Sequence, residues 1–176
     1  MIGRFLLYIP IFLFTVFAAY SQCPTVNNPT QSFCDTESVL VSDLQAIDNG
    51  NGIVWYDTAT STEPLNSNAG LNNGEDYYAD DNSGTCGSRQ RVEVVILGPP
   101  TGQNFQGVCL DDPSNATVAN LVAIGNDIQW YLQPTGGVAL DESTVLMDNT
   151  LYYADQSNPD SGCRTSRLSV LVNVGS

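Results

Sequence analysis

The sequence predicts an all-β protein: a cleaved signal peptide followed by two antiparallel β-sandwiches in tandem. Landmarks of the chain recur at a constant spacing of 75 residues, among them the phrases around Trp55 and Trp130. Beyond the N-terminal segment, no stretch shows a sustained 3.6-residue apolar period. Instead, short β-branched and aromatic runs alternate with Gly, Asn, Asp and Pro, which is typical of a β-sandwich.

Residues 1–21 have the layout of a secretory signal peptide. A basic start precedes an apolar run over residues 5–18, and small residues stand before a cleavage site at Gln22. The run is shorter than the roughly 20 residues that a membrane-spanning helix needs, and it contains Pro10. We therefore expect export, with no membrane span in the mature chain. Lipidation of Cys23 is the weaker alternative, because Gln22 stands where such sites have a small residue.

The rest of the chain is interpreted as two repeats, residues 22–98 and 99–176. Separated landmarks at one spacing indicate an internal repeat. The matching pairs are Pro24/Pro99, Gln31/Gln106, Cys34/Cys109, Trp55/Trp130, Tyr77/Tyr152 and Tyr78/Tyr153. Between the repeats, Gly98 and two prolines predict a short and fairly stiff joint.

Strands are expected at four places in each repeat, where β-branched and aromatic residues gather between turn residues. The ranges are 39–44, 53–57, 76–80 and 89–97 in the first repeat, and 117–123, 128–132, 150–155 and 166–174 in the second. The last strand of each repeat alternates apolar residues on one face, as a half-buried antiparallel strand does.

Trp55 and Trp130 are expected to anchor the two cores. Each stands in the second expected strand of its repeat, in an Ile-x-Trp-Tyr phrase. A buried tryptophan removes roughly 150–250 Å² from water, which is a large share of what so small a module can bury.

Tyr77 and Tyr152 have the spacing of a tyrosine corner, in which a tyrosine hydroxyl bonds back to the preceding connection. In each repeat a leucine, a glycine or asparagine, and the tyrosine stand at positions 0, 3 and 6. Gly74 and Asn149 at the middle position suit the left-handed backbone of such a corner. We expect both tyrosines to be core anchors as well.

Together these motifs resemble the immunoglobulin-like repeats of large secreted surface proteins of Bacteroidota. Such repeats often precede a gliding-motility-associated or sorting C-terminal domain. The resemblance covers nearly all of residues 24–174, and it implies an extracellular, non-enzymatic spacer or adhesion module. The residues that carry it are Gln31, Phe33, Cys34, Leu44, Trp55, Tyr56, Leu65, Leu71, Gly74, Tyr77, Tyr78, Cys86, Ser88 and Val94, then Gln106, Cys109, Leu121, Trp130, Tyr131, Leu140, Leu146, Tyr152, Tyr153, Cys163 and Val170. The sequence departs from that family in having two copies and no sorting domain, which leaves open a truncated reading frame or a component of a larger assembly.

Five cysteines in an exported chain predict an oxidising compartment. In antibody domains the second disulfide cysteine follows the corner tyrosine by two residues. Ala79 and Ala154 occupy that position here, so the antibody bridge is excluded.

Disulfides are expected within each repeat instead, between Cys34 and Cys86 and between Cys109 and Cys163. Reduced, buried cysteines are the alternative, and a metal site is less favoured because the chain has no histidine and no Cys-x-x-Cys. Cys23 lies outside the repeated module, and its state as free, lipidated or intermolecular stays open.

The charge balance excludes several function classes. Without Arg4, four arginines remain against 19 acidic residues, giving a formal charge of −15. Nucleic acid binding needs clustered Lys or Arg, so it is not expected. Because histidine is absent, Ser-His-Asp and Cys-His catalysis are excluded, and adjacent carboxylates do not establish a glycosidase pair. We expect no enzyme and no cofactor.

Calcium is the one ion for which the sequence offers ligands. Oxygen-rich turns occur at residues 48–52, 80–84 and 155–162, yet none follows the spaced Asp pattern of an EF-hand. Solvated loop acids are the favoured interpretation, and a calcium site in one of these turns is the weaker alternative.

Four tyrosines are expected to face away from the cores: Tyr56, Tyr78, Tyr131 and Tyr153. Each neighbours an expected core residue, so strand alternation turns it to the opposite face. They are candidates for an aromatic strip that binds glycans or other cell-surface proteins, and ordinary cross-strand packing is the alternative. The sequence thus predicts a structural or adhesive surface protein, with a carbohydrate- or protein-binding module as the second hypothesis.

Overall fold

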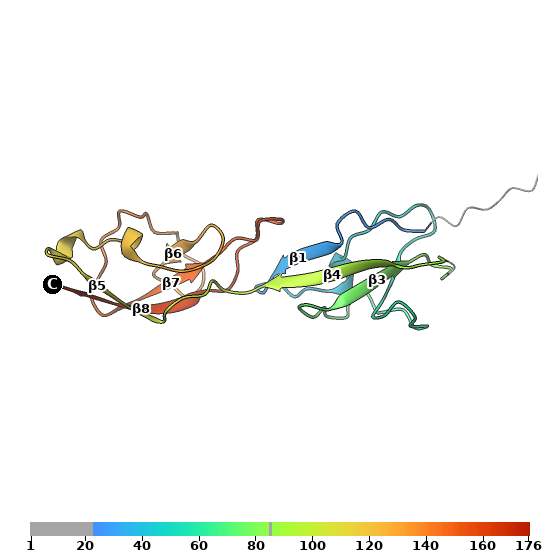
Figure 1. The fold of residues 1–176 in the computed structure, drawn as a ribbon, viewed down its shortest axis with the longest axis horizontal. Coiled ribbons are helices and arrows are strands. Elements are labelled where there is room, and N and C mark those ends of the chain that lie inside the picture. Colours follow the sequence, from blue (N-terminus) through green and yellow to red (C-terminus); the bar gives the residue numbers. More distant parts are fainter. Residues whose placement is uncertain (1–22, 85) are drawn as a thin grey trace, which may run out of the picture.

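The computed structural model describes residues 23–84 and 86–176, so the expected signal peptide over residues 1–21 lies outside the described residues. The described chain is all-β apart from short 3-10 turns, and its strands form two four-stranded sheets. The two sheets lie end to end in an elongated molecule (Figure 1), and the C-terminus lies at the far end of the second sheet. The all-β class predicted from the sequence is confirmed.

Both sheets have the same strand order. The first runs β1-β4-β3-β2, with β1 (Thr30–Cys34), β2 (Val54–Tyr56), β3 (Asp76–Asp80) and β4 (Gln90–Leu97). The second runs β5-β8-β7-β6, with β5 (Phe105–Cys109), β6 (Gln129–Tyr131), β7 (Thr150–Asp155) and β8 (Leu168–Gly175). In each sheet the first strand pairs in parallel with the last, and the other pairs are antiparallel. The sheets are therefore mixed, and the prediction of purely antiparallel sheets is wrong.

The second layer of each half is not a full sheet in the described residues. It is made of single bridges, such as Leu40 with Gly70 and Thr117 with Val145, together with 3-10 turns. Each core is consequently closed by one sheet on one side and by irregular chain on the other.

The strands expected at residues 39–44 and 117–123 are wrong. Those segments form the 3-10 turns η1 (Val41–Asp43) and η3 (Val118–Asn120). In η1 the Asp43 carboxylate accepts the N–H of Leu40 at 2.8 Å, and in η3 the Asn120 side chain accepts the N–H of Thr117 at 2.8 Å. A short polar side chain that bonds the local backbone competes with a strand ladder, which explains both turns.

Strands β1 and β5 were not expected from the sequence, because neither has a β-branched run. Glutamine side chains tie them to the other layer. Gln31 donates to the Gln45 carbonyl at 2.6 Å and accepts the Gln45 N–H at 2.8 Å. Gln106 bonds Val122 in the same way, at 2.6 Å and 2.9 Å. These strands are thus specified by non-local pairing, to which intrinsic propensity contributes little.

Each sheet covers its own apolar core. Trp55 and Trp130, with 7% and 6% of their surface exposed, lie in the two cores. Central β4 and β8 each bury two valines completely, which is worth about 1.5–3 kcal/mol per side chain in transfer free energy. The buried strand valines are Val92, Val94, Val170 and Val172.

Tyr77 and Tyr152 both form the expected corner. The Tyr77 hydroxyl accepts the N–H of Asn72 at 3.0 Å, and the Tyr152 hydroxyl accepts the N–H of Met147 at 2.8 Å. The turn residues between them are left-handed, with φ of 79° at Gly74 and 51° at Asn149. Both corner tyrosines are buried in the cores.

Candidate functional site: the joint between the sheets

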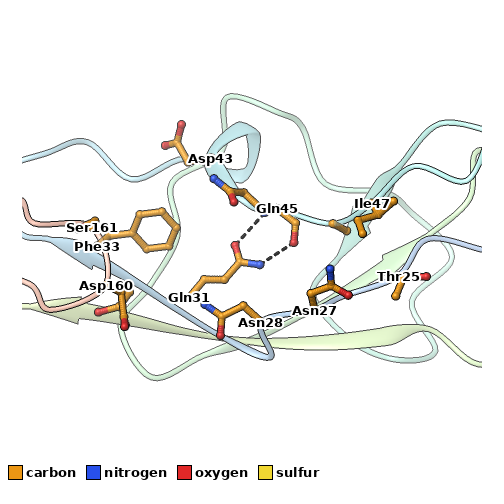
Figure 2. Close-up of a pocket in the computed structure, with 12 residues that line it drawn as sticks. Thr25, Asn27, Asn28, Gln31, Phe33, Asp43, Gln45, Ile47, Asp160 and Ser161 are labelled. Carbon is orange, nitrogen blue, oxygen red and sulfur yellow. Dashed lines mark hydrogen bonds between the residues drawn. The ribbon is translucent and has the colours of Figure 1, made fainter.

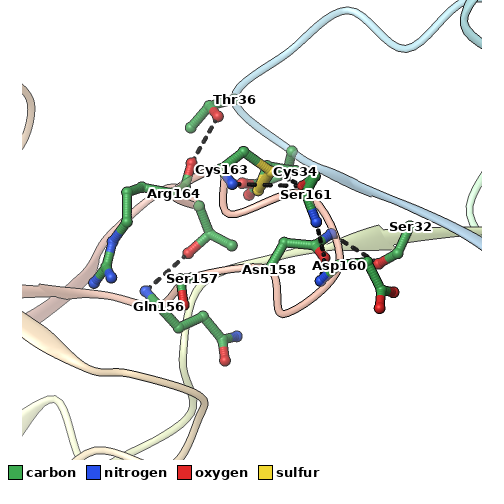
Figure 3. Close-up of a disulfide and its surroundings, with 12 residues drawn as sticks. Ser32, Cys34, Thr36, Gln156, Ser157, Asn158, Asp160, Ser161, Cys163 and Arg164 are labelled. Atoms are coloured by element: carbon green, nitrogen blue, oxygen red, sulfur yellow. Dashed lines mark hydrogen bonds between the residues drawn. A yellow bond between two sulfur atoms is a disulfide. The ribbon is translucent and has the colours of Figure 1, made fainter.

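A disulfide between Cys34 and Cys163 joins the two sheets. Cys34 ends β1, and Cys163 lies in the β7–β8 connection of the second sheet, with 6.2 Å between the two Cα atoms. Figure 3 shows this connection reaching back over the end of β1. Cys34 has no exposed surface.

The disulfides expected from the sequence, Cys34–Cys86 and Cys109–Cys163, are wrong. Cys34 pairs in register with Leu97 at the end of β4, whereas Cys86 precedes the start of β4. The eight residues of β4 separate the two cysteines by roughly 25 Å, and a disulfide needs Cα atoms within about 7 Å. Strand β8 separates Cys109 from Cys163 in the same way.

Cys86 is bonded to Cys23 instead, with a Cα–Cα distance of 5.7 Å. Cys23 belongs to the segment that enters the first sheet, directly before the buried Pro24. Both Cys23 and Cys86 are half-buried. Cys109, at the end of β5, is exposed and is the free thiol among the described cysteines.

Hydrogen bonds reinforce the joint around the disulfide. Asp35 accepts the N–H of Ser166 at 2.7 Å and also the Ser166 hydroxyl. The Thr36 hydroxyl donates to the Arg164 carbonyl at 2.9 Å, as drawn in Figure 3. Such polar bonds fix the orientation of the two surfaces as well as their distance.

Two amide side chains of the β7–β8 connection also reach the first half. Asn158, which is fully buried, donates to the Ser32 hydroxyl at 2.8 Å. Gln156 donates to the Gly98 carbonyl in the linker at 2.9 Å. The buried Pro100 follows in the same linker, so the joint is held by the chain itself, a disulfide and side-chain bonds.

Tyr56 is not part of an exposed aromatic strip, as its strand position had suggested. Only 6% of its surface is exposed, because the Arg89 guanidinium lies 3.3 Å from its ring centroid. Arg89 Nε also donates to the buried Asp80 carboxylate at 2.9 Å. The arginine therefore compensates a buried charge and covers the tyrosine at once.

Tyr131 is buried in an equivalent cluster of the second sheet. The Arg167 guanidinium lies 3.3 Å from the Tyr131 ring centroid and its Nε is 3.2 Å from Asp155. Arg164 also pairs with Asp155. Burial raises the pKa of the Tyr131 hydroxyl above its usual value, and the neighbouring Asp155 carboxylate raises this pKa further.

Tyr78 and Tyr153 are half-buried and stand opposite Tyr56 and Tyr131 on the neighbouring strands. The four tyrosines thus form two cross-strand pairs, and one member of each lies under an arginine. Sequence reasoning missed the arginines. The available signal was that the four arginines after Arg4 all stand just before the last strand or at its start in each half.

A cleft of about 420 Å³ opens beside the joint. Figure 2 shows Phe33 at one end, near Asp160, and Ile47 at the other, with the Gln31 side chain between them. Asp43 also borders the cleft. An aromatic ring beside amide and carboxylate groups can contact a small polar ligand such as a sugar.

The one group of metal-ligating residues found in the described chain does not fit a metal. Asp80, Asp81 and Cys86 bring their ligand atoms within 4.8 Å of one another. However, the Cys86 sulfur is in a disulfide and Asp80 is paired with Arg89. In the turn at residues 48–52, one Asp48 oxygen accepts the N–H groups of two glycines, which organises the loop itself.

No protein-family model matches this chain, and no curated protein sequence matches it. Its function must therefore be argued from the joint, the two arginine clusters and the cleft. Within the described residues, none of the helical turns has the length and apolar character to cross a bilayer. The two disulfides fit an extracellular or otherwise oxidising environment.

Proposed function

We propose that this protein is a non-enzymatic spacer or adhesion module, secreted or held at the cell surface, built from two immunoglobulin-like units in tandem. The observation that carries the proposal is the covalent joint between Cys34 and Cys163. A hinge between two modules needs no such bond, whereas a spacer that must keep its length and direction benefits from one.

The joint stabilises the folded arrangement in two ways. In the chain-entropy model, closing a loop across a separation of 129 residues contributes about 5 kcal/mol. The hydrogen bonds of Asp35 and Asn158 then limit rotation about the disulfide. The formal charge of −15 on the mature chain favours solubility and keeps neighbouring molecules apart.

The disulfides also set how far the chain extends under tension. With both bonds intact, the shortest covalent route from Cys23 to Ser176 passes through Cys34 and Cys163. It contains 26 residues, 23–34 and 163–176, which extend to roughly 90 Å. The full 154 residues from 23 to 176 would extend to roughly 540 Å.

Single-molecule force spectroscopy tests the proposal. The wild-type chain should extend to roughly 90 Å before the handles detach, and the Cys34→Ser variant to roughly 320 Å, because the route then runs through Cys23–Cys86. Full reduction should give roughly 540 Å. A wild-type chain that extends as far as Cys34→Ser would contradict a role as an inextensible spacer.

A second candidate function is the binding of a small carbohydrate in the cleft beside the joint, favoured by the position of Phe33 beside Asp160. A glycan array should then show binding that is lost in Asp160→Ala and retained in Asp148→Ala, a carboxylate outside the cleft. Equal binding by both variants, or none by the wild type, would reject the cleft as a sugar site.

A further inference from the structure

Cys34 and Cys109 occupy the same place in the two sheets, but only Cys34 is bonded. They stand 75 residues apart, each at the end of a strand that runs parallel to the last strand of its sheet. Cys34 pairs in register with Leu97, and Cys109 with Gly175. In both halves, the residue after the cysteine donates its N–H to the carbonyl of the cysteine's partner in the last strand, at 3.0 Å each. The backbone therefore presents the Cys109 side chain as it presents Cys34.

The partner of Cys34 comes from the unit that follows it. Cys163 lies before the last strand of the second sheet and reaches back to the end of β1. This contact leaves Cys34 with no exposed surface, whereas Cys109 is exposed at the far end of the molecule. Cys109 is thus a strand-end cysteine without a following unit in the described chain.

Cys86 stands in the first half where Cys163 stands in the second, before the last strand of the sheet. It has no preceding unit in the described chain, and it is bonded to Cys23 of the entry segment. That segment matches the linker: Thr25 bridges Ile47 as Thr101 bridges Ile124. Cys23 thereby fills the place that the strand end of a preceding unit would take.

We propose that the protein assembles head to tail through Cys109 and the Cys86 of a second copy. The Cys109 thiolate attacks the Cys86 sulfur of the second copy, forming a Cys109–Cys86 disulfide and releasing Cys23 as a thiolate, which takes up a proton. One disulfide breaks and one forms, so no oxidant is consumed.

The structure favours this exchange over attack on the joint. Both cysteines of the Cys23–Cys86 bond are half-buried. In the joint Cys163 is half-buried too, but Cys34, which an attack on Cys163 would release as a thiolate, is fully buried. Because the two joined surfaces differ, each added copy presents a new Cys109, and the contact can propagate beyond a dimer. A Cys109–Cys109 bond would instead stop at a dimer.

The test incubates the purified full chain in a glutathione redox buffer, followed by a non-reducing gel and peptide mapping. Wild type should form a ladder beyond dimers, with Cys109 linked to Cys86 and Cys23 alkylatable. Cys109→Ser should give no ladder. Cys23→Ser, which leaves Cys86 without its partner in the entry segment, should increase the fraction beyond dimers several-fold under oxidation.

Two results would overturn the proposal. One is a wild type and a Cys23→Ser variant that both stay monomeric with Cys109 alkylatable. The other is a product limited to Cys109–Cys109 dimers. The assembly extends the spacer proposal but fails separately from it, because the single-chain extension limit set by Cys34 and Cys163 does not involve Cys109.

Discussion

The carboxamide of Gln31 takes the place of a neighbouring strand for Gln45, since it bonds both the N–H and the carbonyl of that residue. Gln106 and Val122 repeat the arrangement in the second half. One side chain therefore links the edge strand of each sheet to the irregular layer across the core.

We expect Gln31→Leu to lower the free energy of unfolding by about 2 kcal/mol. Leucine has a similar volume, but it leaves two backbone groups of Gln45 without their side-chain partner in a part-buried setting. Urea unfolding measures the loss. The matched control is Gln90→Leu at an exposed strand position, which should change stability by no more than about 0.5 kcal/mol. Equal effects of the two variants would show that the carboxamide bridge adds nothing.

Tyr77→Phe should lower the free energy of unfolding by about 1 kcal/mol, because the N–H of Asn72 loses its hydroxyl acceptor while the ring keeps its packing. Tyr152→Phe should have a similar effect through Met147. Tyr153→Phe, on a half-buried ring of the outer face, is the control and should be nearly neutral. Thermal unfolding followed by circular dichroism compares the three, and a neutral Tyr77→Phe would argue against an energetic role for the corner.

Arg89→Met should cost about 3 kcal/mol or more of unfolding free energy. The change leaves the Asp80 carboxylate, 2% exposed, without its cation. Arg91→Met is the matched control, since the Arg91–Asp76 pair is far more exposed and such pairs contribute about 0–1 kcal/mol. Arg89→Lys should recover only part of the loss, because lysine lacks the planar fork that lies over Tyr56. Denaturant unfolding of the three variants measures these losses. Equal losses in Arg89→Met and Arg91→Met would contradict a stabilising role of Arg89 beside Asp80.

Alkaline pH should destabilise the second half through Tyr131. Its pKa is raised in the folded state, by burial and then by Asp155, so the folded state holds the phenolic proton more tightly than the unfolded state. The stabilisation that this proton gives the folded state is complete when the pH is below the ordinary tyrosine pKa of about 10. It is lost as the pH rises through the pKa of Tyr131 in the folded state.

Unfolding free energies of wild type and Tyr131→Phe, measured from pH 8 upward in a Cys109→Ser background that prevents thiol exchange, check this expectation. Wild type should lose more stability than Tyr131→Phe above about pH 10. Parallel pH curves would exclude Tyr131 as the group responsible.

Local signals in the sequence located the central strands. Strands β3 and β7 begin and end where the sequence places them, and Trp55 and Trp130 lie in the cores. The tyrosine corners were also readable, because each hydroxyl and the backbone N–H that it accepts, five residues earlier, belong to one local motif. Each of these features depends on residues close together in the chain.

Features decided by distant residues were not readable. The edge strands β1 and β5 are polar, and what fixes them is pairing with β4 and β8. The expected exposure of Tyr56 failed because alternation gives the face of a side chain but not what covers it. The disulfides failed for the same reason, since sequence repetition suggested bonds within repeats while the fold places strand-end and loop cysteines at opposite ends of each sheet.

The order in which the four bonded cysteines pair has a consequence for proteolysis. Cys23 bonds Cys86 and Cys34 bonds Cys163, so the two closed loops overlap along the chain. A single backbone cut anywhere between Cys23 and Cys163 leaves both fragments tied by at least one disulfide. At the extracellular location that we propose, where peptidases act, one nick would leave the molecule in one piece.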